Sequence, residues 1–350
     1  MTMRERMMAV LEGREHDRVP FVQYSGLAAP DEQVWAEIGR ARVGILRWTR
    51  AHRLEHPHCH VEHEDTVAEC RSLRRTTLHT PEGSLVEERA FEGGYGSSCI
   101  RRHFVQEPAD YKVLNAFLRD AVVADDTAAW RQVDAALGED GLPLTAVERT
   151  PYQQLWVQWA GLENLAVHLA EQPQVVEETL ELLAAQARQV FEVAARSPAP
   201  FVDFPDNITA PVVGAERFRR WCVPFYDDLA GMLGESGRRV FVHMDGDLRP
   251  LHTAIGQSRV GGIDSFSPCP DGDTRLAEAR SAWPQMRLWA NFPSSCHLRP
   301  YREVRAVAER LLEEDGRSGL LQLQVSENVP RQAWRTSYRA IAEAVEAFDR

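Results

Sequence analysis

Short apolar runs recur along the chain and alternate with stretches of helical periodicity. Eight runs show almost no polar alternation, which is typical of parallel strands that are buried on both faces. They span residues 19–24, 43–48, 143–147, 201–204, 240–244, 262–266, 288–291 and 320–325. Helical patterns lie between most of them, at residues 175–195, 216–234, 301–312 and 330–348. Strands alternating with helices in this number predict an α/β fold, a (β/α)8 TIM barrel.

A doubly wound sheet is the alternative architecture. It would usually carry a glycine-rich phosphate turn after its first strand, and Ser25-Gly-Leu-Ala-Ala29 is no such motif. Between residues 55 and 106, short β-like runs are separated by turn signals at Thr80-Pro-Glu-Gly83 and Glu92-Gly-Gly-Tyr-Gly96. This pattern predicts an antiparallel β-hairpin insertion after the second strand. Because no long linker divides the chain, we expect residues 1–350 to form a single barrel domain.

Composition and charge narrow the class of protein. The 350 residues include 52 Asp and Glu against 40 Lys and Arg, which gives a net charge of −12. An acidic chain without a Lys/Arg block lacks the electrostatic footprint of a nucleic-acid-binding protein. No apolar run is long enough for a membrane span, and the charged start does not resemble a signal peptide. We therefore expect a cytoplasmic protein with reduced thiols, whose acidic surface allows a homodimer.

In barrel enzymes the active site lies at the carboxyl ends of the strands, so polar residues there are the candidates. His243-Met-Asp245-Gly is the sharpest local signal, because residues i and i+2 of a strand point to the same side. Imidazole and carboxylate are good zinc ligands. The alternative is a histidine that is hydrogen-bonded to a structural carboxylate. Glu327 follows the last strand and could reach across the mouth, or it could precede and cap the helix expected from Pro330.

Other strand ends supply candidate substrate contacts. Asp206 and Asn207 end the fourth strand and could orient a substrate hydroxyl or hold a proton, with helix capping as the alternative. The remaining candidates for substrate binding are Gln23, Tyr24, Arg149, Tyr152 and Asn291. Trp156 and Trp159 are candidates for either the pocket wall or the core.

Five of the twelve histidines lie between His52 and His63, together with Cys59. His58, His60 and residue 62 alternate along one expected strand of the hairpin. No second cysteine or reciprocal ligand at a fixed spacing accompanies them. We therefore interpret this segment as a solvated face of the hairpin in preference to a metal site. The six cysteines form no C-x-x-C pair, so zinc-ribbon and redox motifs are absent.

Several motifs, in order and spacing, resemble the uroporphyrinogen decarboxylase superfamily. The opening Arg4-Glu-Arg-Met-Met-Ala-Val-Leu-Glu-Gly13 with Asp17-Arg-Val-Pro20 is similar to its start. The similarity continues through Val242-His-Met-Asp-Gly246, Pro270-Asp-Gly-Asp273 and Ser326-Glu-Asn-Val-Pro330. The resemblance implies a (β/α)8 barrel, and the superfamily includes cobalamin-dependent methyltransferases that act with corrinoid proteins. The decarboxylase itself carries Arg-Gln-Ala-Gly-Arg where this chain reads Phe21-Val-Gln-Tyr-Ser-Gly26. Without those arginines, decarboxylation of a porphyrinogen is not expected.

The resemblance also implies a ligand set. The thiol-methylating branch binds zinc through His-x-Cys and a cysteine after the last strand. Here Asp245 and Glu327 take the places of those cysteines, beside His243. Carboxylates and imidazole form a harder site than thiolates do, and a better Lewis acid toward a substrate oxygen. His243 and Glu327 are thus the first choices as ligands, with Asp245 as the third ligand or as their partner.

The resemblance therefore favours a zinc-dependent methyltransferase. It would move a methyl group from a small methoxylated or methylated substrate to a corrinoid. The chain contains no Asp-x-His-x-x-Gly motif, so the corrinoid (cobalamin) would arrive on a partner protein or free. Asp206, Asp245 and Glu327 are the expected catalytic residues.

Two other classes of function stay open. A decarboxylase or lyase of a small carboxylic acid would use Asp206 or Glu327 as a proton donor with a raised pKa, and Arg149 would grip a substrate carboxylate. A non-catalytic binding protein on the same fold is the third class, because fold alone does not establish activity.

Overall fold

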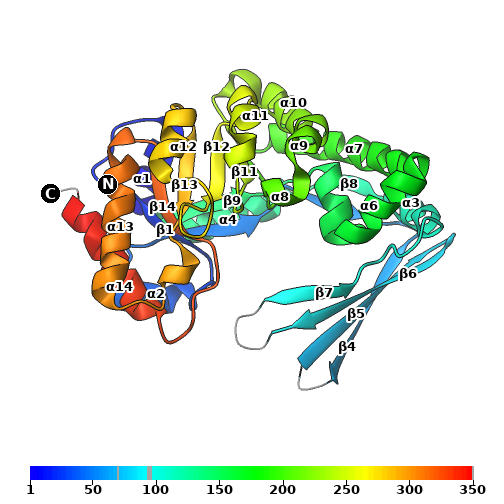
Figure 1. The fold of residues 1–350 in the computed structure, drawn as a ribbon, viewed down its shortest axis with the longest axis horizontal. Helices are drawn as coiled ribbons and strands as arrows, with labels where there is room; N and C mark the ends of the chain where they lie inside the picture. The colour runs from blue at the N-terminus through cyan, green and yellow to red at the C-terminus, as the bar shows by residue number, and fades with distance from the viewer. Residues whose placement is uncertain (69–70, 93–96, 349–350) are drawn as a thin grey trace. The chain divides into compact units, whose positions relative to one another are not determined.

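A computed structural model describes residues 1–68, 71–92 and 97–348 (Figure 1). Contacts within the chain form two compact units. Unit 1 comprises Met1–Ala51, Thr127–Val147 and Ser197–Arg350, and unit 2 comprises His52–Asp126 and Glu148–Arg196. Whether the two units form the single domain expected from the sequence stays a prediction.

Unit 1 contains eight parallel strands. In sheet order they are β10 (Phe201–Phe204), β11 (Arg239–His243), β12 (Gly262–Phe266), β13 (Arg287–Asn291), β14 (Leu321–Val325), β1 (Phe21–Tyr24), β2 (Gly44–Thr49) and β9 (Gly141–Thr145). A bridge between Ala146 and Asp203 joins the last strand to the first, so the sheet is a nearly closed barrel. The predicted (β/α)8 barrel is confirmed, and each of the eight predicted strands overlaps an observed one.

Helices connect these strands in unit 1. The α-helices are α1 (Met3–Glu12), α2 (Asp31–Ile38), α4 (Thr127–Leu137), α8 (Ala210–Val213), α9 (Ala215–Trp221), α10 (Val223–Leu233), α11 (His252–Gln257), α12 (Leu276–Ala282), α13 (Tyr301–Asp315) and α14 (Trp334–Phe348). Short 3-10 turns are η1 (Gly138–Asp140), η3 (Gly234–Ser236), η4 (Arg249–Leu251), η5 (Ser294–Cys296) and η6 (Gly316–Ser318). Within the described part of the chain, no helix has the length and apolar character needed to cross a membrane.

Two predicted helix boundaries are wrong. The helix expected over residues 216–234 is divided at Cys222, and Pro224 lies in the first turn of α10, where its missing N–H is tolerated. The last helix begins at Trp334, because residues 331–333 form a turn whose end is held by the Pro330 carbonyl. That carbonyl accepts hydrogen bonds from the backbone N–H groups of Ala333 and Trp334.

Alternate strand positions fill the barrel interior with large apolar side chains. The cluster consists of Val22, Tyr24, Leu46, Leu142, Leu144, Phe201, Phe241 and Trp289, together with Met3, Met7 and Leu11 of α1. The Trp289 ring lies 4.9 Å from that of Phe201 and 4.2 Å from that of Phe241, centroid to centroid. Because strand side chains alternate, residues two positions beyond Phe241 and Trp289 also face inward, nearer the carboxyl ends. These residues are His243 and Asn291.

Unit 2 contains the β-rich insertion that the sequence predicts after the second strand. An antiparallel sheet consists of β4 (His60–Ala68), β5 (Arg71–Thr80), β6 (Gly83–Phe91) and β7 (Ser98–Arg102), and β3 (His52–Glu55) pairs with β8 (Val122–Asp125). Its helical segments are α3 (Asp110–Asp120), α5 (Pro151–Gln154), the π-helical turn η2 (Leu155–Trp159), α6 (Leu162–Glu171) and α7 (Pro173–Arg196). Most of the turn expected at residues 92–96 lies outside the described residues.

Gly141 marks a close approach between β9 and β2. A Cβ added there would lie 2.0 Å from the backbone oxygen of Ile45, which strand pairing holds in place. We expect Gly141→Ala to lower the free energy of unfolding by about 1–3 kcal/mol, measured by urea titration. Gly231→Ala in α10 is the matched control, because its Cβ would meet the flexible end of Arg259 at 3.2 Å and alanine favours a helix. Equal losses in the two variants would contradict this account of the barrel.

Candidate metal centre

His243 ends β11 and places its imidazole at the carboxyl end of the barrel. Its side chain is 8% exposed. Nδ1 lies 2.9 Å from Oδ2 of Asp264 and 3.2 Å from the hydroxyl oxygen of Tyr24. When Nδ1–H donates to Asp264, Nε2 is the ring nitrogen that can lose its proton to a metal ion. This is the arrangement by which a carboxylate orients a histidine that binds a metal.

Asp245 and Glu327 bring two carboxylates to that nitrogen. Asp245 lies two residues after β11, and its Oδ2 is 3.5 Å from Nε2 of His243. Glu327 follows β14, on the strand's carboxyl side. One potential ligand atom from each of the three residues lies within 4.8 Å of the other two. One nitrogen and two oxygens suit zinc, whose catalytic sites use three protein ligands and keep a fourth position open.

The protonation of these three groups is coupled. Burial lowers the pKa of His243, but the hydrogen bonds and charges of Asp245 and Asp264 outweigh it and hold that pKa well above the ordinary value. Burial raises the pKa of Asp245, and the contact with His243 more than reverses this effect. Burial, followed by the charge of Asp245, raises the pKa of Glu327. A cation between the two carboxylates would remove the repulsion that contributes to that rise.

Asp264 is itself held by a buried network. The Tyr24 hydroxyl donates to its Oδ2, and the Gln324 amide donates to its Oδ1 at 2.9 Å. Burial, with the charges of Asp264 and Asp203, raises the pKa of Tyr24 well above its usual range, so its hydroxyl stays a donor. Each polar atom of the Asp264 carboxylate therefore has a partner, as a charge removed from water requires.

Ser265 joins this network through an unusual backbone. Its φ is +58°, and the register between β12 and β13 shifts between Ile263 and Phe266. Its hydroxyl lies 3.0 Å from that of Tyr24 and accepts from the Gln324 amide at 3.2 Å. Consecutive residues of a regular strand point to opposite faces, so this irregularity lets Ser265 contact the same partners as its neighbour Asp264.

The residues predicted from the sequence include neither Gln324 nor Ser265. The sequence nevertheless contains a signal for Gln324, because Gln322 and Gln324 are two amides at i and i+2 in an otherwise apolar strand. Both are fully buried, and the Gln322 amide donates to Oε1 of Gln324 at 3.1 Å. Two such positions in one apolar strand indicate a polar network inside the barrel.

Two predicted substrate contacts support the centre's own residues. Asn207, at φ +54°, donates from Nδ2 to Oδ2 of Asp245 at 3.1 Å. Oδ1 of Asn291 accepts from the backbone N–H of Ser326 at 2.9 Å, which holds the segment just before Glu327. Their contact with a substrate stays a prediction.

Gln23 and Asp206 are occupied by contacts within the fold. Gln23 accepts from the Tyr338 hydroxyl at 2.9 Å and donates to Asp31 at 3.2 Å. Oδ2 of the fully buried Asp206 accepts from the Tyr226 hydroxyl at 2.5 Å. The catalytic role expected of Asp206 and the substrate contact expected of Gln23 stay predictions.

Arg149 and Tyr152 belong to unit 2, and their expected part in substrate binding stays a prediction. Tyr152 is buried, at 3% exposure. Trp159 packs its ring 5.5 Å from that of Phe104 and 6.1 Å from that of Phe117, which favours its interpretation as a core residue.

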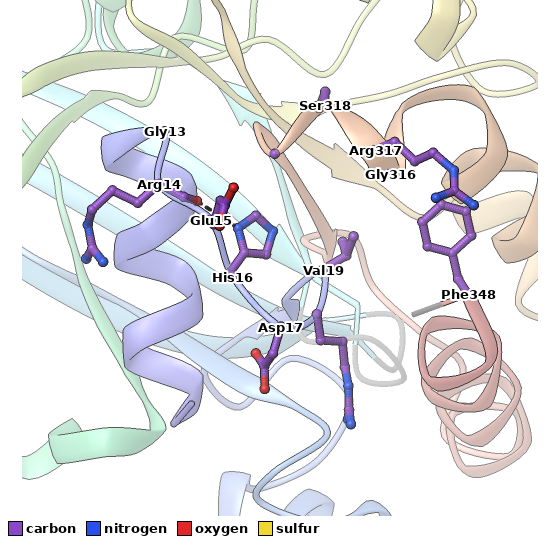
Figure 2. A pocket seen from close by; sticks show the side chains of 12 residues that line it. Gly13, Arg14, Glu15, His16, Asp17, Val19, Gly316, Arg317, Ser318 and Phe348 are labelled. Atoms are coloured by element: carbon purple, nitrogen blue, oxygen red, sulfur yellow. Dashed lines mark hydrogen bonds between the residues drawn. The ribbon is translucent and has the colours of Figure 1, made fainter. Parts of the chain in front are cut away.

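A pocket of about 710 Å³ in unit 1 lies at the amino ends of the strands (Figure 2). Residues 13–19, ahead of β1, and residues 316–319, ahead of β14, line it together with Phe348. Sites in barrels of this kind lie after the strands. This pocket therefore lies at the end of the strands opposite to His243.

No protein-family model matches the sequence, and a comparison with curated proteins finds no significant relative. Among solved structures, the chain is similar to a methyltransferase from Methanosarcina mazei, with a TM-score of 0.63 and 12% identity over 99% of both chains. This likeness shows that the two proteins share a barrel fold. The B12-independent methionine synthase from Shewanella sp. W3-18-1 aligns with a TM-score of 0.48 and 10% identity, over 94% of this chain and 97% of that one. The resemblance stated from the sequence motifs is confirmed at the level of fold.

Asp264→Asn tests the support of His243 without removing a potential ligand. The amide keeps the size of the side chain but loses the charge that holds Nδ1–H, so we expect the zinc affinity to fall by about 10–100-fold. Competition with a chromophoric chelator measures the affinity, and circular dichroism checks the fold. Asp227→Asn is the matched control, because Asp227 accepts from the backbone N–H of Arg259 elsewhere in unit 1. An unchanged affinity in Asp264→Asn would show that the network does not orient a ligand.

Proposed function

We propose that this chain is a zinc-dependent methyltransferase. It takes a methyl group from an oxygen or nitrogen substituent of a small methoxylated or methylated molecule and delivers it to a corrinoid. The convergence of His243, Asp245 and Glu327 at the carboxyl end of the barrel carries the proposal. The fold likeness to a methyltransferase from Methanosarcina mazei supports methyl transfer as the reaction class.

The donor set favours an oxygen leaving group. Carboxylate and imidazole groups are harder ligands than thiolates are. A bound zinc ion would act as a Lewis acid and stabilise the negative charge that develops on the substrate oxygen as the methyl group leaves. A methyl ether of an aromatic or small aliphatic alcohol is therefore the substrate class that we favour.

The chain's own residues position the ligands. Asp264 contacts Nδ1 of His243 and so leaves Nε2 toward the centre, Asn207 holds Asp245, and Asn291 holds the segment that leads to Glu327. Ligands held in this way lose little conformational freedom when an ion binds, which raises affinity and fixes the open position.

Trp48 supplies an exposed aromatic surface at the same end of the barrel. It lies two residues after the inward-facing Leu46 on β2, is 39% exposed, and packs edge-on against Tyr24 with 5.5 Å between ring centroids. An aromatic methyl donor could stack on this ring. The corrinoid would accept the methyl group as a free cofactor or on a partner protein.

A decarboxylase of a small carboxylic acid, not of a porphyrinogen, is the second candidate. The raised pKa of Glu327 favours it, because a carboxyl group that stays protonated nearer neutral pH can donate a proton to a developing carbanion. This reaction would not require zinc.

His243→Ala and Glu327→Gln should each remove the zinc of this centre and lower methyl transfer by more than about 100-fold, because loss of the groups that merely orient ligands already costs about 10–100-fold. Elemental analysis measures the metal. The absorbance change of free cob(I)alamin, incubated with a panel of methoxylated aromatics, measures methyl transfer.

Matched controls come from the pocket of Figure 2. His16→Ala and Glu15→Gln change the same residue types at the other end of the strands and should keep both zinc and activity. Full methyl transfer by His243→Ala, or by zinc-free protein, would refute the proposal. Release of CO2 that survives zinc removal but is lost in Glu327→Gln would establish the decarboxylase instead.

A further inference from the structure

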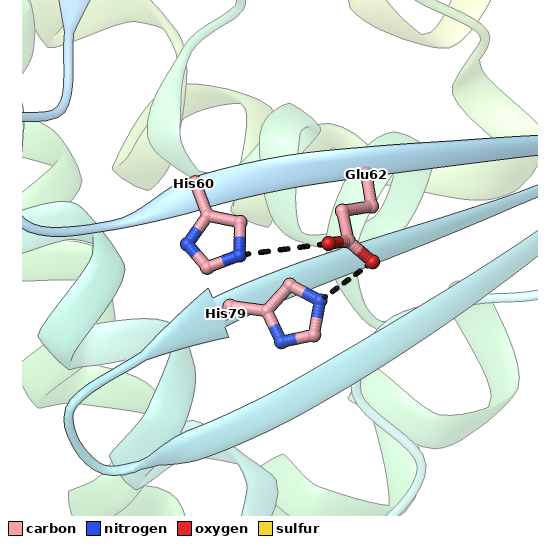
Figure 3. A group of neighbouring side chains, drawn as sticks. All are labelled: His60, Glu62 and His79. Atoms are coloured by element: carbon pink, nitrogen blue, oxygen red, sulfur yellow. Dashed lines mark ion pairs between the residues drawn. The ribbon is translucent and has the colours of Figure 1, made fainter.

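A second group of potential metal ligands lies on the antiparallel sheet of unit 2. His60 and Glu62 are two residues apart on β4, and His79 lies directly opposite His60 on β5. Residues at i and i+2 share a face of a strand, and directly opposite residues share a face of the sheet. All three side chains therefore stand on one face. Figure 3 shows both imidazoles turned toward the carboxylate of Glu62.

The distances suit a shared ion. Nε2 of His60 lies 3.8 Å from Oε1 of Glu62, and Nε2 of His79 lies 3.3 Å from Oε2. One potential ligand atom from each residue lies within 4.8 Å of the other two. Tetrahedral zinc with ligands at about 2.0–2.1 Å separates its ligand atoms by about 3.3 Å. His60 and Glu62 are exposed, so small side-chain rotations suffice to reach that spacing.

Ser84 orients His79. It lies opposite His79 on β6, and its Oγ is 2.9 Å from Nδ1 of the imidazole. When Nδ1–H donates to Ser84, the lone pair of Nε2 points toward Glu62. This Nε2 is shielded from solvent and has no hydrogen-bond partner among the described residues. Its neighbour there is the Glu62 carboxylate at 3.3 Å, so an ion that displaced a proton from Nε2 would lie between the two groups.

The other face of this sheet is the one that packs against the rest of the protein, so these three side chains are not part of the packed core. Leu78 and Leu85, on that face, are 3% and 4% exposed. Alternation along β5 then turns His79 to the other face, where the ligands gather.

We propose that His60, Glu62 and His79 bind a divalent transition-metal ion, zinc foremost, and that this ion links β4 to β5. Two imidazoles and one glutamate are a ligand set that proteins use for zinc with a fourth position left open. The site lies wholly within unit 2 and shares no residue with the His243 centre.

Zinc titration of the full chain tests this proposal, by calorimetry and by elemental analysis after gel filtration. His60→Ala, His79→Ala and Glu62→Gln should each bind one zinc ion fewer than the unmodified chain, and Ser84→Ala should bind the same ion about 10–100-fold more weakly. His243→Ala should lose a different ion, and His79→Ala combined with His243→Ala should bind none. Failure of this proposal is thus distinguishable from failure of the proposed function.

Two neighbours on β4 are matched controls. His63 lies on the face opposite to the proposed ligands. Glu64 lies on the same face as Glu62, two residues further along β4. His63→Ala and Glu64→Gln should bind zinc as the unmodified chain does. Wild-type stoichiometry in His79→Ala, or an equal loss in His63→Ala, would overturn the proposal. Weak binding that none of the substitutions changes would show an adventitious ion only.

Discussion

The hydrogen bond between His243 and the carboxylate of Asp264 is the interaction on which the candidate centre depends. The two side chains are 8% and 0% exposed, so each charge needs a partner within the protein. Tyr24 and Gln324 provide those partners for Asp264. The result fixes which nitrogen of His243 faces the neighbouring carboxylates. Because the pKa of His243 is raised, that nitrogen carries a proton and pairs with Asp245 until a metal ion displaces the proton.

Sequence periodicity predicts the eight strands because a buried parallel strand is apolar on both faces. For the same reason it says little about which positions face inward. Gln23 and Tyr24 are both expected at the mouth, yet alternation allows only one of them to face the interior. Tyr24 does so, whereas Gln23 contacts Tyr338 of α14. To predict which of the two residues faces inward, one needs the register of β1 against its neighbouring strands. An apolar run in the sequence does not contain that information.

The polar groups that the sequence misses have equally specific causes. Ser265 contacts Tyr24 because its φ of +58° breaks the alternation of β12, which no residue pattern reports. The hairpin histidines gain a neighbour that spacing along one strand does not report. His79 is opposite His60 because of the strand register. Spacing within one strand can show that His60 and residue 62 share a face, but the partner strand must be paired before a third ligand appears.

The two ligand groups differ in the surroundings of their ligands, and this difference bears on their roles. At the His243 centre, three potential ligands are each held by other side chains or by a braced segment; His243 is buried, and Asp245 and Glu327 are partly buried. On the hairpin, Ser84 orients one ligand while His60 and Glu62 stay exposed. An ion in the first setting is partly removed from water, where its charge acts more strongly on a substrate oxygen. An ion in the second setting is screened by solvent, so its effect is to join two strands. We therefore place the proposed methyl transfer at the barrel centre, and we expect an ion on the hairpin to act on the stability of the sheet.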